Sequence, residues 1–361
     1  MKAAVLGTGS MGTGVARSLR FYEGITGTVA YDVREDAFQW LKDLPEIETT
    51  TDLNRVLNDP EIKLVYVTAI NDQHANLAIA ALEAGKAVMC EKPMALSYAE
   101  SLKMCEVAEA QNGWLQIGFE LRYSKLYMQI KEWIEAGVLG DVVSVHCDYI
   151  CDEFHGKNSW RNETAIGGSM FGEKLSHYVD LPRWWIGSPV ESVYSACAPN
   201  VVPYFQVHDN YHTTYRFQNG AVSSLHFSMY AAQTGEGDTL QETASQTNNR
   251  DNGGHALKYL ISGTRGAIAT DVFERTAKRW EFTDAPDRLR STLVETKTWQ
   301  AEEDQEFFHN CYGQNEDIAR RVHHGLPPST PARDALETMK LVFAAELSAN
   351  ENRVVQLSEL G

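Results

Sequence analysis

The sequence predicts two domains: an α/β domain built on a doubly wound parallel sheet, and an α+β domain with a large, mostly antiparallel sheet. Up to Gly118, short apolar runs alternate with helical stretches, a pattern typical of parallel strands joined by helices. Beyond about residue 140, several strand-like runs follow one another without helices, which indicates antiparallel or mixed pairing. A chain of 361 residues is also long for one core. We therefore expect domains at residues 1–121 and 122–361.

The N-terminal segment predicts a strand, a glycine-rich turn, a helix and a second strand. Lys2 to Leu6 is a nearly all-apolar run, and the turn Gly7 to Gly12 (GTGSMG) follows at once. An amphipathic stretch runs to about Phe21, and a second apolar run, Gly27 to Tyr31, ends in Asp32. This order is that of a dinucleotide-binding Rossmann βαβ unit, although an ordinary strand-to-helix turn is the alternative.

Each glycine of the turn has a distinct expected role. Gly7 allows the tight turn, Gly9 lets the backbone approach a pyrophosphate, and Gly12 lets the helix pack closely on the strand. Asp32 is placed to accept hydrogen bonds from the adenosine ribose, which favours NAD over NADP because a 2′-phosphate would meet like charge. Arg34 lies nearby and weakens that preference.

The alternation continues to the end of the first domain. The capping box Ser97-x-x-Glu100 predicts a helix start, and Gly85 is typical of a helix C-terminus. The expected helices are Glu35–Leu44, Asp52–Leu57, Gln73–Ala84 and Ser97–Gln111, and the expected strands are Lys63–Thr68, Lys86–Cys90 and Trp114–Gly118.

Polar residues follow two of these strands, at the sheet edge where doubly wound folds bind ligands. Asn71 and His74 come after the strand at residues 63–68, and Glu91-Lys92-Pro93 comes after the strand at residues 86–90. For His74, a polar residue facing water and a cofactor contact are equally open interpretations. Lys92 is expected to point toward the nicotinamide, since the proline next to it fixes the backbone.

The second domain is expected to begin near Arg122. The polar stretch Gln233–Gly254 predicts an irregular loop, and Thr330 with Pro331 predicts the start of a last helix running to about Asn350. The expected helix Tyr123–Ala136 is followed by strands at Asp141–Asp152, Val190–Ala198, His212–Phe217, Ala221–Met229, Ala256–Gly263 and Ala267–Val272.

A second group of chemically active residues follows Gly167-Gly168. If Glu173 to Trp185 is helical, Glu173, His177 and Asp180 lie near one face, at i, i+4 and i, i+3 spacings. A lone histidine on such a helix is usually a core residue, but two carboxylates in reach favour catalysis.

The residues above resemble those of the Gfo/Idh/MocA family, the glucose-fructose oxidoreductase and inositol dehydrogenase group. The resemblance rests on GTGSMG, on AALEAGKAVMCEKPMALS at residues 80–97, and on Gly167-Gly168 followed by His177-x-x-Asp180. It implies that Lys92 contacts substrate and nicotinamide, and that His177 is the general base on a sugar hydroxyl. The family's usual aspartate four residues before this histidine is Glu173 here, and its threonine-proline-asparagine reads Ala69-Ile70-Asn71.

The resemblance implies an NAD(P)-dependent oxidoreductase that acts on a secondary hydroxyl of a sugar or cyclitol. Because Glu173-Lys174 also occurs in NAD-dependent, redox-neutral glycoside hydrolases of the family, hydrolysis is one alternative. A non-catalytic dinucleotide-binding regulator is the other. The expected catalytic residues are Lys92, His177, Glu173 and Asp180. The residues expected to bind the cofactor are Gly7, Thr8, Gly9, Ser10, Met11, Gly12, Asp32, Arg34, Asn71, His74, Glu91 and Lys92; those expected to bind the substrate are Lys92, Arg122, Trp160, Arg161, Lys174 and His177.

Composition narrows the choice of partners. A formal net charge of −17 argues against a nucleic-acid partner, and no apolar run reaches the ~20 residues that span a bilayer. The six cysteines show no C-x-x-C pair, so we expect reduced thiols in a cytoplasmic protein. No secretory signal is evident at the N-terminus. We expect no metal site, exposed side chains at His323-His324, and a homodimer or homotetramer formed through the C-terminal sheet.

Overall fold

The computed structural model describes residues 1–151, 155–229, 256–304 and 308–360, and divides into two compact units. Unit 1 comprises Met1–Glu120, Ala165–Gly168 and Cys311–Lys340, and unit 2 comprises Leu121–Thr164, Ser169–Asn310 and Leu341–Gly361. The first crossing between units lies next to the expected boundary at residue 122. Residues 311–340 return to unit 1, so a single boundary in the sequence does not separate the two units. The expected loop at Gln233–Gly254 lies outside the described residues.

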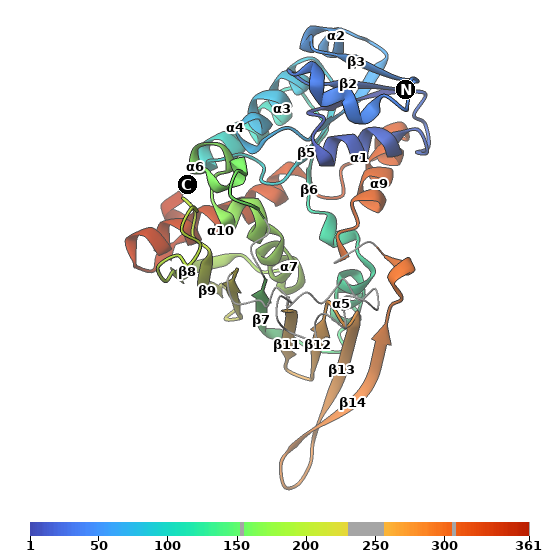
Figure 1. Ribbon diagram of the computed structural model, residues 1–361. Helices are drawn as coiled ribbons and strands as arrows, with labels where there is room; N and C mark the ends of the chain where they lie inside the picture. Colours follow the sequence, from blue (N-terminus) through green and yellow to red (C-terminus); the bar gives the residue numbers. More distant parts are fainter. Residues whose placement is uncertain (152–154, 230–255, 305–307, 361) are drawn as a thin grey trace, which may run out of the picture. The chain divides into compact units, whose positions relative to one another are not determined.

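Unit 1 is a doubly wound α/β domain, as predicted (Figure 1). Its parallel sheet has the strand order β3-β2-β1-β4-β5-β6, so the winding reverses between β1 and β4. The strands are β1 (Lys2–Leu6), β2 (Gly27–Tyr31), β3 (Ile47–Thr50), β4 (Ile62–Val67), β5 (Ala87–Glu91) and β6 (Leu115–Gly118), and the helices are α1 (Ser10–Leu19), α2 (Leu53–Leu57), α3 (His74–Glu83), α4 (Tyr98–Ala110) and α9 (Cys311–His323).

In unit 1, one predicted helix is of another type, and one strand was not predicted. The helix expected at Glu35–Leu44 is a 3₁₀ helix, Glu35–Leu41, because β3 follows so closely that few residues remain for a longer helix. Strand β3 itself was not predicted. Only its first and last residues are buried, so its sequence, IETT, shows neither an apolar run nor an apolar–polar alternation.

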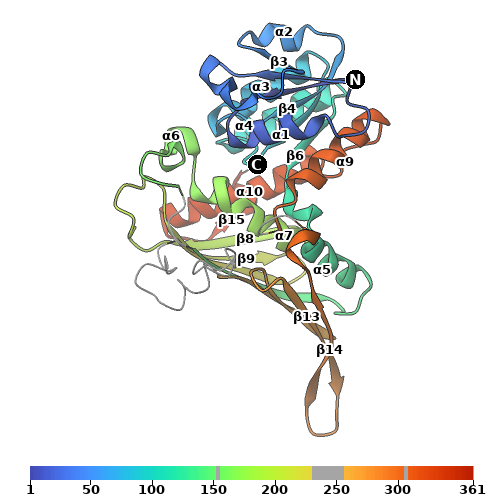
Figure 2. The ribbon, with the colours of Figure 1, turned by 45° about the vertical axis from the view of Figure 1, so that its right-hand side comes forward.

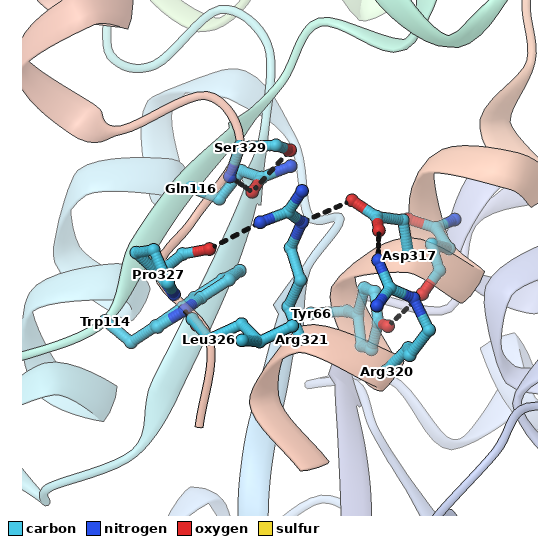
Figure 3. Close-up of polar contacts among 10 residues, drawn as sticks. Tyr66, Trp114, Gln116, Asp317, Arg320, Arg321, Leu326, Pro327 and Ser329 are labelled. Carbon is cyan, nitrogen blue, oxygen red and sulfur yellow. Dashed lines mark hydrogen bonds and ion pairs between the residues drawn. The ribbon is translucent and has the colours of Figure 1, made fainter. Parts of the chain in front are cut away.

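The returning segment is tied to the unit 1 sheet by α9 and by the chain that follows it (Figure 3). Ser329 donates its N–H and its hydroxyl to Oε1 of Gln116 in β6, at 2.9 and 3.2 Å. The indole N–H of Trp114 donates to the carbonyl oxygen of Leu326 at 2.9 Å. The hydroxyl of Tyr66 in β4 donates to the carbonyl of Asn315. These bonds explain why residues 311–340 belong to unit 1.

Unit 2 contains one large, mostly antiparallel sheet with helices on one face, as predicted (Figure 2). The strand order is β14-β13-β12-β11-β7-β10-β9-β8-β15, and β7 with β10 is its parallel pair. The strands are β7 (Val142–Ile150), β8 (Val190–Ala196), β9 (Asn210–Phe217), β10 (Val222–Ser228), β11 (Ala256–Gly263), β12 (Gly266–Asp271), β13 (Thr276–Asp284), β14 (Leu289–Thr298) and β15 (Val355–Gln356). The helices are α5 (Lys125–Glu135), α7 (Ser176–Ile186) and α10 (Ala332–Glu351), which begins in unit 1.

The sequence missed the hairpin of β13 and β14, which extends beyond the rest of the sheet (Figure 2). Its side chains are mostly exposed, so neither strand carries the apolar face that marks a buried strand.

The expected helix at Glu173–Trp185 is interrupted. Residues Phe171–Leu175 form a π-helical turn, and the α-helix α7 starts only at Ser176. Such π-helical turns are frequent at functional sites.

The turn after β1 leaves no room for side chains at two glycines. A Cβ at Gly12 would overlap the carbonyl oxygen of Gly7, and a Cβ at Gly7, whose φ is +97°, would lie 2.5 Å from Cα of Ala69. Gly14, in the same helix, has open space around it. Close contact of α1 with the end of β1 therefore depends on Gly12, and close contact of the turn with Ala69 depends on Gly7.

We expect Gly12→Ala to lower the free energy of unfolding by about 1–3 kcal/mol, because the added methyl must displace α1 from β1. The matched variant Gly14→Ala should stabilise the chain by roughly 0.5–1 kcal/mol, since alanine favours a helix and meets no atom. Urea unfolding of the two variants measures both effects. Equal stability of the two variants would contradict the close packing at Gly12.

Candidate functional site

The dinucleotide edge of unit 1 is built around the glycine turn and Asp32. Oδ2 of Asp32 accepts hydrogen bonds from the N–H and the hydroxyl of Thr8, at 2.9 and 3.1 Å. Oδ1 accepts from the N–H of Arg34 at 3.1 Å, and the hydroxyl of Thr13 donates to the carbonyl of Thr8 at 3.0 Å. The turn therefore holds the carboxylate in one orientation at the end of β2.

The same turn suits a pyrophosphate. Gly9, the residue before α1, makes no side-chain cap, and a Cβ at this glycine would face open space. The first N–H groups of α1, from Ser10 and Met11 onward, are placed where helices bind phosphates. Arg34 has a mostly exposed side chain, with Nε 4.0 Å from Oδ1 of Asp36, so its charge is partly offset.

His74 is buried in unit 1 and joins two chain segments at the sheet edge. Nδ1 lies 2.7 Å from the carbonyl oxygen of Pro93, and Nε2 lies 3.0 Å from that of Ala69. Burial lowers the pKa of His74, and a neutral imidazole donates to only one of these carbonyls. The interpretation of His74 as a residue facing water is therefore wrong. Nearby, the amide of Asn71 donates to the carbonyl of Gly167 at 2.9 Å.

Glu91 and Lys92 end strand β5 at the same edge. Lys92 is partly buried and Glu91 is buried, and the Lys92–Pro93 peptide bond is cis. Burial, with a further contribution from the Glu120 carboxylate, raises the pKa of Glu91 to about 8, while Lys92 opposes the shift. Among the described residues, Oε1 of Glu91 has no hydrogen-bond partner.

The sequence did not single out Cys311, the first residue of α9. Burial raises the pKa of its thiol, the carboxylates of Glu120 and Glu91 raise it further, and Lys92 opposes them. Cys311 therefore lies close enough to these three side chains to share their electrostatic environment. No local signal predicts this, because it depends on the return of residues 311–340 to unit 1.

In unit 2, Glu173 is held in the π-helical turn by basic side chains. Nε of Arg161 donates to Oε1 of Glu173 at 2.8 Å, and Nε2 of His155 lies 3.6 Å from Oε2. The guanidinium of Arg161 also stacks on the ring of Trp160, 4.4 Å from its centre. The structure thus brings together Glu173 and two of the expected substrate-binding residues, Trp160 and Arg161.

Asp180 forms a buried, bidentate ion pair with Arg122. Nε and Nη2 of Arg122 donate to Oδ2 and Oδ1 of Asp180, at 2.7 and 2.6 Å. Asp180 is 1% exposed, and the side chain of Arg122 is 9% exposed. The ion pair joins α7 to the segment that precedes α5. It also neutralises the positive charge that Arg122 would otherwise present to a substrate.

His177 is 1% exposed and lies in the first turn of α7. Its ring centre is 5.4 Å from that of His309, in an edge-to-face arrangement. Lys174, one turn earlier, places Nζ 5.8 Å from the ring centre of Tyr149. Tyr149 itself is buried, with its ring 4.7 Å from that of Tyr178, so it is a core residue.

Potential metal ligands in unit 1 gather at Glu23, His323 and His324, all exposed as expected for the two histidines. Nε2 of His324 lies 3.1 Å from Oε1 of Glu23, the distance of a surface ion pair. The six cysteines are free thiols, as predicted. Among the described residues, no helix has the length and the apolar character needed to cross a bilayer.

The chain matches two family models. Residues 1–119 match the model described as "Oxidoreductase family, NAD-binding Rossmann fold", and residues 131–357 match "Oxidoreductase family, C-terminal alpha/beta domain". Together these matches cover most of the chain, which includes both groups of candidate site residues.

Three relatives illustrate the range of similarity. Levoglucosan dehydrogenase of Pseudarthrobacter phenanthrenivorans is 28% identical over 69% of this chain and 65% of its own length. Inositol 2-dehydrogenase of Salmonella typhimurium is 32% identical over 54% of this chain and 56% of its own. The chain thus spans less than two thirds of these two relatives. Myo-inositol 2-dehydrogenase of Thermotoga maritima is 23% identical over 100% of this chain and 99% of its own length.

Solved structures share the fold at low identity. A levoglucosan dehydrogenase in complex with NADH and levoglucosan matches with a TM-score of 0.79 and 22% identity, over 99% of both chains. A putative NADPH-dependent oxidoreductase from Desulfitobacterium hafniense matches with a TM-score of 0.78 and 19% identity, over 99% of this chain and 98% of the other. These matches show that the chain shares the fold of these proteins over almost its whole length.

We expect Glu91→Gln to change the pH dependence of stability. The folded protein keeps the Glu91 proton up to about pH 8, whereas an unfolded glutamate loses it near its ordinary pKa of 4.5. The contribution of Glu91 to stability is therefore present at low pH and is lost as the pH rises toward 8, by at most about 1.4 kcal/mol per pH unit. Glutamine has no such loss, so the variant should gain stability relative to the parent between about pH 5.5 and pH 8.5 in urea unfolding.

Glu109→Gln is the matched control. Glu109 is paired with Arg333, which lowers the pKa of its carboxylate, so it stays ionised over the same pH range. The effect of Glu109→Gln on the free energy of unfolding should therefore be the same at about pH 5.5 and about pH 8.5. A pH-independent effect of Glu91→Gln would mean that Glu91 is ionised in the folded protein.

Proposed function

Because this chain belongs to the Gfo/Idh/MocA oxidoreductase family, we propose that it is an NAD-dependent dehydrogenase that oxidises a secondary hydroxyl group of a sugar or cyclitol. The names of the levoglucosan and inositol dehydrogenases support this class of substrate. The particular sugar or cyclitol, and the carbon that is oxidised, are left to experiment.

One observation carries the proposal: the turn-held carboxylate of Asp32 and the amine of Lys92 belong to the same edge of the unit 1 sheet. Asp32 follows β2 and Lys92 follows β5, with β1 and β4 between them (Figure 1). Three strand spacings of about 4.8 Å separate the two strand ends by roughly 14 Å. An extended dinucleotide with its adenosine ribose at Asp32 and its phosphates on α1 would therefore direct its nicotinamide toward Lys92.

In the proposed reaction, bound NAD supplies the hydride acceptor. His177 takes the proton of the substrate hydroxyl as a general base. Lys92, as an ammonium group, stabilises the negative charge that develops on the same oxygen. Glu173, fixed by Arg161, helps His177 or holds a neighbouring hydroxyl. Asp180 serves the reaction mainly by fixing α7 through Arg122.

The preference for NAD rests on Asp32. Its two oxygens accept hydrogen bonds from Thr8 and from the N–H of Arg34, which hold the carboxylate in one orientation at the end of β2. A 2′-phosphate at this place would meet the carboxylate. The exposed guanidinium of Arg34 reduces the discrimination without reversing it.

Redox-neutral glycoside hydrolysis is the second candidate, favoured by one feature: glutamate and lysine stand together at Glu173-Lys174. The ion pair with Arg161 argues against it, because it neutralises the carboxylate that would serve as an additional acid or base. A non-catalytic regulator would have no reason to keep both Lys92 and His177.

We propose further that the chain forms a homodimer or homotetramer through the unit 2 sheet. Leu289, Leu293 and Val294 of β14 are exposed, and light scattering of the full chain tests this.

The test is a screen of sugars, inositols and aryl glycosides with NAD and with NADP, following the absorbance of reduced nicotinamide. A dehydrogenase should form reduced cofactor in proportion to the substrate consumed. Release of phenol from an aryl glycoside, without net reduced nicotinamide, would establish the hydrolase instead.

We expect NAD to bind at least ten-fold more tightly than NADP, a difference of about 1.4 kcal/mol. Asp32→Ala should narrow this gap because it removes the like charge near the 2′ position. Thr8→Val, which removes one of the three donors that orient Asp32, should narrow it less. Titration by intrinsic fluorescence or calorimetry measures the six affinities of the two cofactors for the three proteins. Equal affinities in the parent protein would refute the assignment of Asp32.

We expect Lys92→Ala and His177→Ala each to lower turnover by roughly 10² or more, because acid–base groups contribute on that order. NAD affinity should stay within a few-fold of the parent value. Steady-state kinetics on the substrate from the screen measures the effect. Lys103→Ala and His324→Ala, which change exposed residues of the same types, are the controls. Near-normal turnover of His177→Ala would make His177 a structural residue.

A further inference from the structure

A carboxylate from α10 lies at the start of the π-helical turn that carries Glu173. Oε1 of Glu346 accepts a hydrogen bond from the hydroxyl of Tyr211 at 2.5 Å. Tyr211, in β9, is fully buried, and its ring packs edge-to-face on Phe171 at 4.8 Å between centres. Glu346 and Phe171, far apart in the sequence, therefore share one packed cluster in unit 2.

Burial raises the pKa of Glu346, and the hydrogen bond from Tyr211 opposes that shift. The hydroxyl of Ser169, the backbone N–H of Phe171 and the charge of His208 also favour the ionised form. Cys197 and Tyr215 are further titratable neighbours, and each has its pKa raised by burial and by Glu346. Glu346 therefore lies near two residues of the chain that enters the π-helical turn, Ser169 and Phe171.

Ser169 holds the start of the same turn. Its Oγ accepts from the N–H of Gly172 at 3.0 Å, and its carbonyl oxygen accepts from the N–H of Glu173 at 2.9 Å. The hydroxyl of Ser176 donates to the carbonyl of Gly172 at 2.8 Å, which closes the turn onto α7. Met170, at the start of the turn, provides no side-chain cap. Ser169 therefore satisfies N–H groups that this start would otherwise leave without partners, and the ring of Phe171 packs on the tyrosine that Glu346 binds.

We propose that Glu346 is a positioning residue for the active centre: it fixes the hydroxyl of Tyr211, whose ring packs on Phe171, and so holds the π-helical turn that carries Glu173 and precedes His177. This proposal rests on the function proposed above for His177. A π-helical turn is less favourable than a continuous α-helix, and it persists where surrounding contacts hold it. A carboxylate at the start of the helical segment also interacts favourably with the helix dipole.

The test compares Glu346→Ala, Glu346→Gln, Tyr211→Phe and the double variant Tyr211→Phe/Glu346→Ala in the full chain. Hydrogen exchange of the peptide covering residues 169–176 reports on the turn directly, without any substrate. We expect Glu346→Ala to accelerate that exchange at least ten-fold. It should also lower turnover about ten-fold, since small displacements of reacting groups cost on that order or more, with NAD affinity unchanged.

The double variant separates positioning from general stability. If Glu346 acts through Tyr211, the double variant should lose little more turnover than Glu346→Ala alone, because the two residues form one path. Glu346→Gln keeps the shape and one acceptor oxygen, so it should recover most of the turnover and should fold even if the alanine variant does not. Glu351→Ala, an exposed glutamate of α10 paired with Arg353, is the control and should match the parent.

Three results would overturn the proposal. These are unchanged exchange at residues 169–176 in Glu346→Ala and Tyr211→Phe, losses that multiply in the double variant, and a Glu351→Ala effect as large as that of Glu346→Ala. Normal turnover of His177→Ala would instead refute the proposed function, while the exchange data would still decide whether Glu346 holds the turn.

Discussion

The close contact between β1 and α1 is the constraint on which the edge of unit 1 depends. Gly12 meets the carbonyl of Gly7 with no space for a side chain, and this contact sets where the helix begins. The turn then presents the N–H and hydroxyl of Thr8 to Asp32. One backbone geometry therefore places both the helix N-terminus, which suits phosphate, and the carboxylate, which suits a ribose.

In unit 2, buried acids are paired with arginines from other segments. Asp180 is paired with Arg122, and Glu173 with Arg161. A buried carboxylate without a partner carries a large free-energy cost, so these pairs strongly restrict how α7 and the turn before it can lie. His177 stands between the two acids in the sequence, on an element that is held at both places.

Glu91, in unit 1, differs from these paired acids because its charged neighbours include a second carboxylate. Its pKa is raised because it is buried beside Glu120, and Lys92 only partly compensates. Strongly shifted acids concentrate at functional sites, where stability is given up for a required charge or proton. Glu91 immediately precedes the lysine that the proposed reaction uses, so its protonation state bears directly on the charge around Lys92.

The sequence by itself determined the elements whose signal is local. Apolar runs, helix ends and the glycine turn predicted unit 1, apart from β3 and α9, and they predicted the succession of strands up to β12 in unit 2. They also placed Asp32 and Lys92 at strand ends. Exposed strands such as β14 lack an apolar face, and the π-helical turn has no periodicity of its own, so neither was predicted. Only the tertiary structure decided which groups meet. Arg122 pairs with Asp180, Glu346 binds Tyr211, and Cys311 lies near Glu91. The residues of each pair are far apart in the sequence, so their meeting depends on the path of the whole chain rather than on local spacing.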